Sequence, residues 1–127
     1  KFLGTPPINV FSGTIKNGKV YIGTDEILSV SDSEDYDREV FVAIRPEGFV
    51  LNSNGALTCE LSGIEVMGRD VSIVSKNPNL IGESIRSIVT SDTLPETTAL
   101  KVSFDVKPGK VFVFDKETEE RIYFEVK

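Results

Sequence analysis

The chain has 127 residues, a net charge of −6, no histidine and one cysteine. Its length fits one domain, and its inventory excludes an internal disulfide framework and a zinc site of histidine and cysteine ligands. The acidic balance argues against nucleic acid as a partner, because binding to phosphates needs a basic face.

The start of the chain carries no sign of a membrane or export segment. No apolar stretch approaches the ~20 residues that a membrane span needs, and no signal peptide is visible. The chain lacks an initiator methionine, so we expect it to begin within a longer polypeptide. Pro6 and Pro7 predict a stiff, extended entry.

Ile15–Val20 predicts a β-hairpin. Asn17 and Gly18 suit the two positive-φ positions of a type I′ turn. A two-residue loop places Lys16 opposite Lys19 and Ile15 opposite Val20.

The segment Asp25–Glu39 holds seven acids and one base, Arg38, and therefore carries the whole charge imbalance. Such a run is usually a solvated loop, and we expect one here, in which the pattern allows one helical turn near Ser31–Asp37. A calcium site is disfavoured because the acidic positions lack the spacing of a calcium-binding loop, so no metal site is expected.

Val40–Ile44 is an unbroken apolar run that predicts a strand buried on both faces. Arg45-Pro46-Glu47-Gly48 ends it, since proline removes a ladder donor and glycine permits a turn. Arg45 and Glu47 flank the proline, and their simplest interpretation is a solvated ion pair at the strand end.

Ala56–Met67 predicts a strand in which Leu57, Cys59 and Leu61 alternate with polar residues. After Gly63 the apolar positions change parity, which predicts a bulge or a corner at that glycine. Cys59 falls on the apolar side and is expected to be a small buried hydrophobe.

The second half of the chain alternates strands and turns. Asn77–Asn79 predicts a turn. The apolar positions Ile81, Ile85, Ile88 and Val89 have helical spacing, but the β-branched residues of Ile85–Thr90 fit a strand equally well. We favour the strand there because five or more strands suit a barrel better. The remaining expectations are a loop at Ser91–Thr98, a strand from Leu100 through Phe104, a type II turn at Lys107–Lys110, a strand at Val111–Phe114, a turn at Asp115–Glu120 and a strand at Arg121–Val126.

Four segments together resemble a known family. Ile44-Arg45-Pro46-Glu47 after an apolar strand, the opening Phe2–Phe11, the turn Glu65–Asp70 and the run Phe112–Thr118 occur in the order found in the C-terminal regulatory domain, called TOBE, of ATPase subunits of sugar-type ABC importers. The importers meant are those for maltose or glycerol phosphate. Two positions depart from the family pattern: Phe112 stands where histidine is usual, and Glu119 stands where glycine is usual.

The succession of short alternating segments predicts an all-β fold. The resemblance implies that this fold is an OB-like small barrel with an additional N-terminal hairpin, in a single domain that spans residues 1–127. It implies that an ABC ATPase domain, with its ATP and Mg²⁺, precedes this chain. The chain itself has no phosphate-binding P-loop and no histidine base, so we expect neither a cofactor nor catalysis in it.

The function implied by the resemblance is regulatory. Such a domain holds two ATPase subunits together, contacts the membrane subunits through the ATPase domain, binds a regulatory protein or a small metabolite in some members, and lies in the cytoplasm at the inner face of the membrane. The candidate interface or ligand residues are Arg45, Glu47, Gly68 and Phe114. One alternative is a domain that senses a sugar or an oxyanion, with Arg45 as a charged donor; the least favoured is a nucleic-acid-binding OB module.

Overall fold

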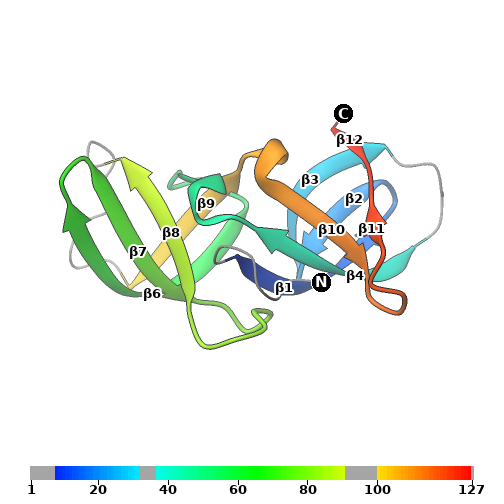
Figure 1. Cartoon of the computed structure of the whole chain (residues 1–127), viewed down its shortest axis with the longest axis horizontal. Helices are drawn as coiled ribbons and strands as arrows, with labels where there is room; N and C mark the ends of the chain where they lie inside the picture. The colour runs from blue at the N-terminus through cyan, green and yellow to red at the C-terminus, as the bar shows by residue number, and fades with distance from the viewer. Residues whose placement is uncertain (1–7, 32–36, 91–99, 127) are drawn as a thin grey trace.

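The computed structural model describes residues 8–31, 37–90 and 100–126, which form two antiparallel sheets (Figure 1). These ranges contain no α-helix. They contain two 3₁₀ turns, η1 (Pro46–Gly48) and η3 (Pro108–Lys110). The predicted all-β, barrel-like fold is confirmed. The expected loop at Ser91–Thr98, the helical turn near Ser31–Asp37 and the extended entry at Pro6 and Pro7 fall wholly or mostly outside the described residues.

The first sheet has seven strands in the order β11-β10-β4-β1-β2-β3-β12. Its strands are β1 (Asn9–Lys16), β2 (Lys19–Ile22), β3 (Asp25–Ser31), β4 (Arg38–Ile44), β10 (Val111–Asp115), β11 (Arg121–Ile122) and β12 (Glu125–Val126). The second sheet has five strands in the order β5-β9-β6-β7-β8. Its strands are β5 (Phe49–Leu51), β6 (Leu57–Met67), β7 (Asp70–Lys76), β8 (Ile85–Thr90) and β9 (Lys101–Val106).

The predicted N-terminal hairpin is present as β1 and β2. Asn17 and Gly18 have φ values of 53° and 72°, and Lys16 lies opposite Lys19 as expected. The hairpin is not an addition to the barrel, however. β1 also pairs with β4, and β2 also pairs with β3, so the hairpin forms the middle of the seven-stranded sheet.

The expectation of a loop across Asp25–Glu39 was wrong at both ends. Asp25–Ser31 is strand β3, and Arg38 and Glu39 begin β4. Within β3, Leu28 and Val30 are buried, at 7% and 2% exposure. The high density of acids concealed this alternation, because the charged and polar side chains occupy the solvent face and the burial of two aliphatic residues outweighs them.

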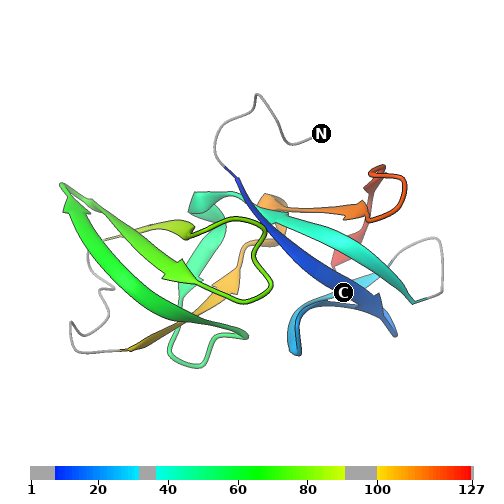
Figure 2. The same ribbon diagram turned by 90° about the horizontal axis from the view of Figure 1, so that it is seen from below.

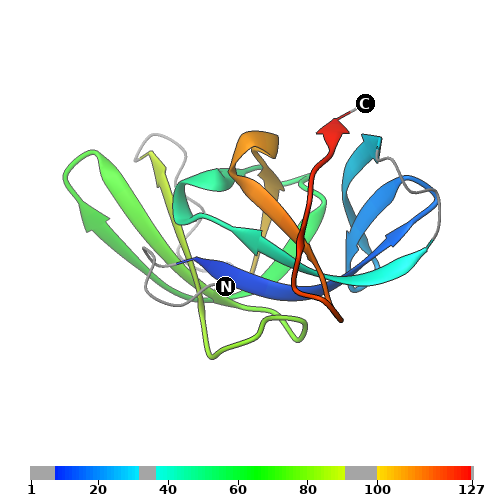
Figure 3. The ribbon, with the colours of Figure 1, turned by 45° about the vertical axis from the view of Figure 1, so that its right-hand side comes forward.

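The last segment does not form one strand, as Arg121–Val126 was expected to do. Instead β11 pairs with β10, whereas β12 pairs with β3. Since β10 and β3 lie towards opposite edges of the same sheet, the C-terminal segment reaches both edges. It thereby closes the seven-stranded sheet into a nearly complete barrel (Figure 3).

The predicted irregularity in the long strand β6 is confirmed. Leu61 lies opposite Ser75 and Gly63 lies opposite Val74, so Ser62 is the extra residue of a bulge next to the glycine. The strand predicted at Ile85–Thr90 is also confirmed, as β8. The turn at Lys107–Lys110 is a 3₁₀ turn rather than type II, because Gly109 does not have the positive φ that a type II turn requires.

The chain passes between the two sheets twice, through η1 and η3. β4 leads through η1 into β5, and β9 returns through η3 into β10. Since β4 pairs with β10 and β5 pairs with β9, the four strands form one long antiparallel ribbon with a kink. The seven-stranded and five-stranded sheets share one continuous hydrophobic core, which includes Phe11 and Val42 from the first and Phe49 and Phe104 from the second.

The Asn9 side chain adds a polar link between the sheets. Its Nδ2 donates to the carbonyls of Ile44 and Arg86, both at 3.0 Å, and its Oδ1 accepts from the Arg86 N–H at 2.9 Å. Asn9 is 7% exposed. A buried amide that satisfies three hydrogen-bonding partners this way substitutes for a ladder contact between β1 and β8. Figure 2 shows β1, in blue, beginning near the junction of the two halves and crossing the half that holds the seven-stranded sheet.

Candidate functional site

Arg45 and Glu47 lie at the kink of the ribbon, where η1 and η3 pack together. The Arg45 N–H donates to the Lys110 carbonyl at 3.2 Å, and the Lys107 N–H donates to the Gly48 carbonyl at 2.7 Å. A Cβ added at Gly48 would lie 2.6 Å from the Cβ of Lys110, so this close approach requires glycine. The turn that the sequence predicted is therefore a fixed corner between the sheets.

The two charges of this corner do not form the ion pair expected between them. Glu47 pairs with Lys110 at 3.5 Å, and both side chains are nearly half exposed. A hydrogen bond from its own backbone N–H, helped by the charges of Lys110 and Arg45, lowers the pKa of Glu47 despite some desolvation. An ion pair this exposed adds little to stability.

Arg45 instead lies over an aromatic ring. Its guanidinium carbon is 5.2 Å from the centroid of Phe112, on β10. The guanidinium carbon of Arg121 lies 4.8 Å from the same centroid and 4.5 Å from that of Tyr123. We call Arg45, Phe112, Arg121 and Tyr123 the arginine–aromatic cluster. Its members come from the residue that follows β4, from β10 and from the C-terminal segment, which only the pairing of β10 with β4 and β11 brings together.

Phe114 lies on the same outer face, two residues along β10 from Phe112. It is half-buried and lies opposite Phe41 in the register with β4. The Lys116 ammonium lies 5.5 Å from the centroid of Phe41, pairs with Glu39 at 3.5 Å and donates to the Ser12 hydroxyl. This outer face of the seven-stranded sheet thus carries phenylalanine rings with cations laid over them.

Gly68 is not part of this assembly. It lies in the β6–β7 hairpin of the five-stranded sheet, at one end of the molecule, whereas β10 and β11 lie in the other half (Figure 1). Its φ is 65°, and an added Cβ would meet nothing within 4 Å. Gly68 is needed for its backbone conformation, and its exposed neighbours Val66 and Met67 offer the apolar surface there.

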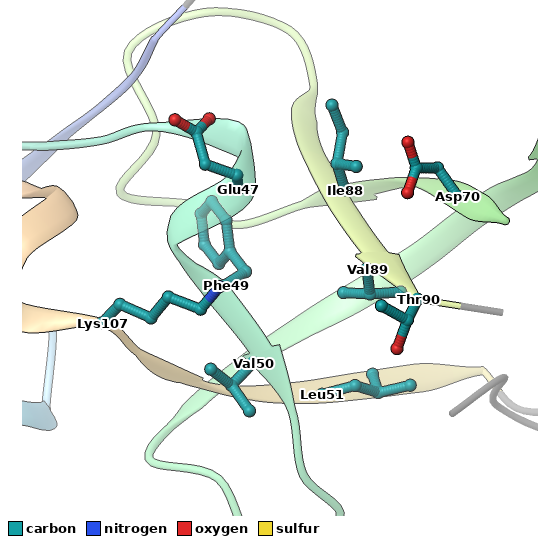
Figure 4. Close-up of a pocket in the computed structure, with 9 residues that line it drawn as sticks. All are labelled: Glu47, Phe49, Val50, Leu51, Asp70, Ile88, Val89, Thr90 and Lys107. Carbon is teal, nitrogen blue, oxygen red and sulfur yellow. The ribbon is translucent and has the colours of Figure 1, made fainter. Parts of the chain in front are cut away.

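A pocket of about 410 Å³ opens between β5 and β8, the two edge strands of the five-stranded sheet (Figure 4). Phe49 and Val89 contribute apolar walls from the two strands, and the carboxylates of Glu47 and Asp70 lie on opposite sides. Lys107 lies on the side of Glu47. The pocket is the open seam of a sheet that does not close.

Cys59 is buried at 3% exposure, as the alternation of its strand predicted. Burial raises the pKa of its thiol to about 11, although Asn77 and Ser75 act in the opposite direction. The thiol is therefore protonated at neutral pH and is a poor nucleophile. Within the described part of the chain, no three acidic, cysteine or histidine residues gather as metal ligands would.

Sequence reasoning singled out Arg45 and Phe114 but missed Phe112, Arg121 and Tyr123 as a group. Phe112 was noted only as a departure from the family pattern, in which histidine is usual, and Arg121 lies in none of the matched motifs. No sequence pattern predicted the pocket either, because the pocket forms between two edge strands that do not pair with each other. No helix in the described ranges is long and apolar enough to cross a membrane.

No protein-family model matches the chain. Among curated proteins, the chain is 30% identical over 121 residues to the sn-glycerol-3-phosphate import ATP-binding protein UgpC of Jannaschia sp. (strain CCS1), a match that covers 95% of this chain and 33% of that protein. It is 29% identical over 135 residues to the oligosaccharides import ATP-binding protein MsmX of Bacillus subtilis, with 95% of this chain and 36% of that protein covered. A putative ATP-binding protein of Brucella abortus (strain 2308) matches at 28% identity over 118 residues, which cover 92% of this chain and 33% of that protein.

The chain thus spans about one third of the length of the curated relatives it matches. A match along nearly all of a short chain and a third of a longer one is consistent with one domain of a larger subunit. This agrees with the similarity that the sequence motifs indicated.

Proposed function

Because this chain is a homologue of part of the ATP-binding subunits of sugar-type ABC importers, we propose that it is the regulatory domain of such a subunit. In this role it holds two copies of the subunit together while their ATPase domains open and close. One observation carries the proposal: the alignments with two import ATP-binding proteins cover 95% of this chain and about one third of each of those proteins.

The fold suits a domain that acts as a rigid tether. A core shared by both sheets, a kinked ribbon and the Asn9 link make the two halves a single body. A rigid body with one self-complementary patch can form a two-fold dimer, since each copy offers the same surface to the other.

Two surfaces are candidates for the contact with a second copy, and each contains a residue that the sequence analysis proposed. The first is the β6–β7 hairpin at Gly68, where Val66 and Met67 are 61% and 51% exposed. The second is the outer face of β10 around Phe114. The hairpin is the stronger candidate because its large apolar side chains lie in water and would gain by burial.

Sedimentation velocity of the chain at rising concentration tests the proposal. We expect weak, reversible dimers at millimolar concentration. The double variant V66D/M67D should sediment as a monomer, because two carboxylates facing their copies across a two-fold axis repel and lose hydration.

The matched control is S53D, which adds a charge at an exposed position in the β5–β6 turn. It should dimerise as the unmodified chain does. A chain that stays monomeric at millimolar concentration contradicts the tethering function. If V66D/M67D still dimerises, the contact lies instead on the face around Phe114.

The proposal extends to the rest of the protein. An ATPase domain that binds ATP and Mg²⁺ would precede this chain and contact the membrane subunits, which would place the whole protein at the cytoplasmic face of the membrane. The coding sequence upstream of Lys1 tests this directly, since it should contain a Gly-x-x-x-x-Gly-Lys-Ser/Thr loop. An upstream sequence without such a loop would contradict the parentage.

A further inference from the structure

The arginine–aromatic cluster combines features of a binding site, and it is separate from any dimer contact at the β6–β7 hairpin. Arg45 follows β4, Phe112 lies on β10, and Arg121 and Tyr123 belong to the C-terminal segment. Three stretches of chain therefore supply it. The two guanidinium carbons lie 5.2 and 4.8 Å from the same ring centroid, so they are at most 10.0 Å apart.

Stacking on a ring leaves an arginine able to bind an anion. The face of the guanidinium contacts the ring, whereas its N–H donors point outward in the plane of the group. These donors form a fork that matches the oxygens of a phosphate or carboxylate. Because the ring limits the freedom of both side chains, less entropy is lost when they bind.

The charges around the cluster favour an anion. In residues 8–31, 37–90 and 100–126, neither Arg45 nor Arg121 takes part in an ion pair. The carboxylate nearest in sequence to Arg45 is Glu47, and its ion-pair partner is Lys110. The charge of Lys110 is therefore offset by Glu47, and Lys107, on the neighbouring turn η3, lines the pocket between β5 and β8 instead of the cluster. Two arginines without an ion-pair partner in the described ranges thus lie at this corner, although Glu119 and Glu120 directly precede Arg121 in the chain.

The cluster is also accessible. Arg121 is exposed and Tyr123 is 74% exposed, whereas Arg45 and Phe112 are half-buried. A ligand would therefore enter from solvent and come to lie against a partly apolar surface, where charge-assisted hydrogen bonds are stronger than in open water. Tyr123, whose ring centroid lies 4.5 Å from the guanidinium carbon of Arg121, also carries a hydroxyl that can donate a hydrogen bond.

We infer that Arg45 and Arg121, held on Phe112, bind a dianionic tetrahedral oxyanion of the phosphate type. Such a group presents enough acceptor oxygens to engage two guanidinium forks at once. It could arrive as free inorganic phosphate or as the phosphate of a small organic monoester. This site goes beyond the tethering function and does not depend on it.

Titration of the ¹⁵N-labelled chain, followed by NMR at constant ionic strength, tests the inference. The probes are inorganic phosphate, glucose 6-phosphate and, as a neutral match, glucose. We expect saturable shifts of the backbone amides at 45, 112 and 121–123 with the two phosphates and none with glucose. Tighter binding of glucose 6-phosphate identifies an organic phosphate as the ligand, and equal or tighter binding of the free ion identifies phosphate itself.

The variants R45K and R121K keep the charge but lose the planar fork, so each should weaken binding at least ten-fold. F112L should weaken it several-fold by releasing both guanidinium groups. R69K, which alters an arginine in the β6–β7 hairpin, should change nothing. Shifts that fail to saturate, or that persist unchanged in both R45K and R121K, overturn the site. A negative result here leaves the dimerisation experiment unaffected, because that one alters the β6–β7 hairpin and not the cluster.

Discussion

The two sheets are built from similar alternating strands, yet one closes and the other stays open. The seven-stranded sheet is closed by the segment that runs from β11 to β12, because its two ends pair with β10 and β3. In the five-stranded sheet, β5 and β8 are both edges, and a pocket of about 410 Å³ lies between them. In this molecule, the sheet that closes is the one whose two edges are reached by a single segment of the chain, through β11 and β12.

The difference also separates two kinds of candidate site. Closure of the seven-stranded sheet places Arg121 and Tyr123 beside Phe112 and makes a charged cluster on the outside. The open seam leaves a largely apolar pocket at the other sheet's edge. The kinked ribbon and a common core join the two regions, and substitutions at Phe104 and Asn9 test how strongly they are coupled.

The largest expected effect comes from F104A in the five-stranded sheet. Phe104 is fully buried and packs edge-on against Phe49, with ring centroids 5.1 Å apart. Loss of the ring should lower the free energy of unfolding by about 3–5 kcal/mol. Because the sheets share one core, urea denaturation followed by circular dichroism should still give a single transition. V66A, at an exposed site, should change stability by less than ~0.5 kcal/mol.

Hydrogen exchange of F104A decides whether the sheets are truly coupled. Amides of β1 and β4 should lose protection together with those of β6 and β7. If β1 and β4 keep the protection of the unmodified chain, the two sheets unfold independently and the shared core does not couple them.

The next largest effect is expected for N9L, which removes the polar link between the sheets. The substitution leaves the N–H and C=O of Arg86 without their side-chain partner. The buried carbonyl of Ile44 also loses its bond from Asn9 Nδ2, and an unsatisfied buried group costs roughly 1–3 kcal/mol. Because the two groups of Arg86 are only part-buried, we expect a total loss of about 2–4 kcal/mol in urea denaturation. N54L, at an exposed asparagine in the β5–β6 turn, is the control. Equal stability of N9L and N54L would show that the link contributes nothing.

A smaller effect of opposite sign is expected for E119G. Glu119 has a φ of 62°, in the left-handed region that costs a non-glycine residue roughly 1–2 kcal/mol. Part of this gain is offset by the greater freedom of glycine in the unfolded chain, so we expect stabilisation by about 0.5–1 kcal/mol. E120G, next to it and without a positive φ, should destabilise slightly. Thermal denaturation of E119G and E120G distinguishes relief of the backbone strain at Glu119 from a general effect of introducing glycine.

The smallest effect concerns the pH dependence of the same turn. Asp115 Oδ1 accepts from the N–H groups of Thr118 and Glu117, at 3.0 and 2.9 Å, and these bonds lower the pKa of Asp115 below its ordinary value of 3.8. A carboxyl whose pKa is lower in the folded state than in the unfolded state stabilises the fold at pH values above its ordinary pKa. That stabilisation is lost as the pH falls through the pKa of the folded state. The stability difference between the unmodified chain and D115A should therefore shrink as the pH is lowered below about 4. A difference that stays constant in urea denaturation down to about pH 2.5 would argue against this account.

Local pattern in the sequence determined much of this molecule. The Asn17-Gly18 turn, the strand ending at Ile44, the irregularity beside Gly63 and the burial of Cys59 all follow from side-chain periodicity or from a backbone preference of one residue. The likeness to importer ATP-binding subunits could be recognised for the same reason, since its motifs are turns and strand ends of fixed local shape. Even Glu119 drew notice by its residue type, although only its φ value explains why glycine suits that position.

Tertiary structure alone decided which of these pieces meet. Acidic side chains concealed β3, because a periodicity of two is hard to see when only two of its aliphatic residues are buried. The split of the C-terminal segment between β10 and β3, and with it the position of Arg121 over Phe112, depends on sheet order. Pairing of strands far apart in the chain is set by how the whole core packs, and no short stretch of residues contains that information.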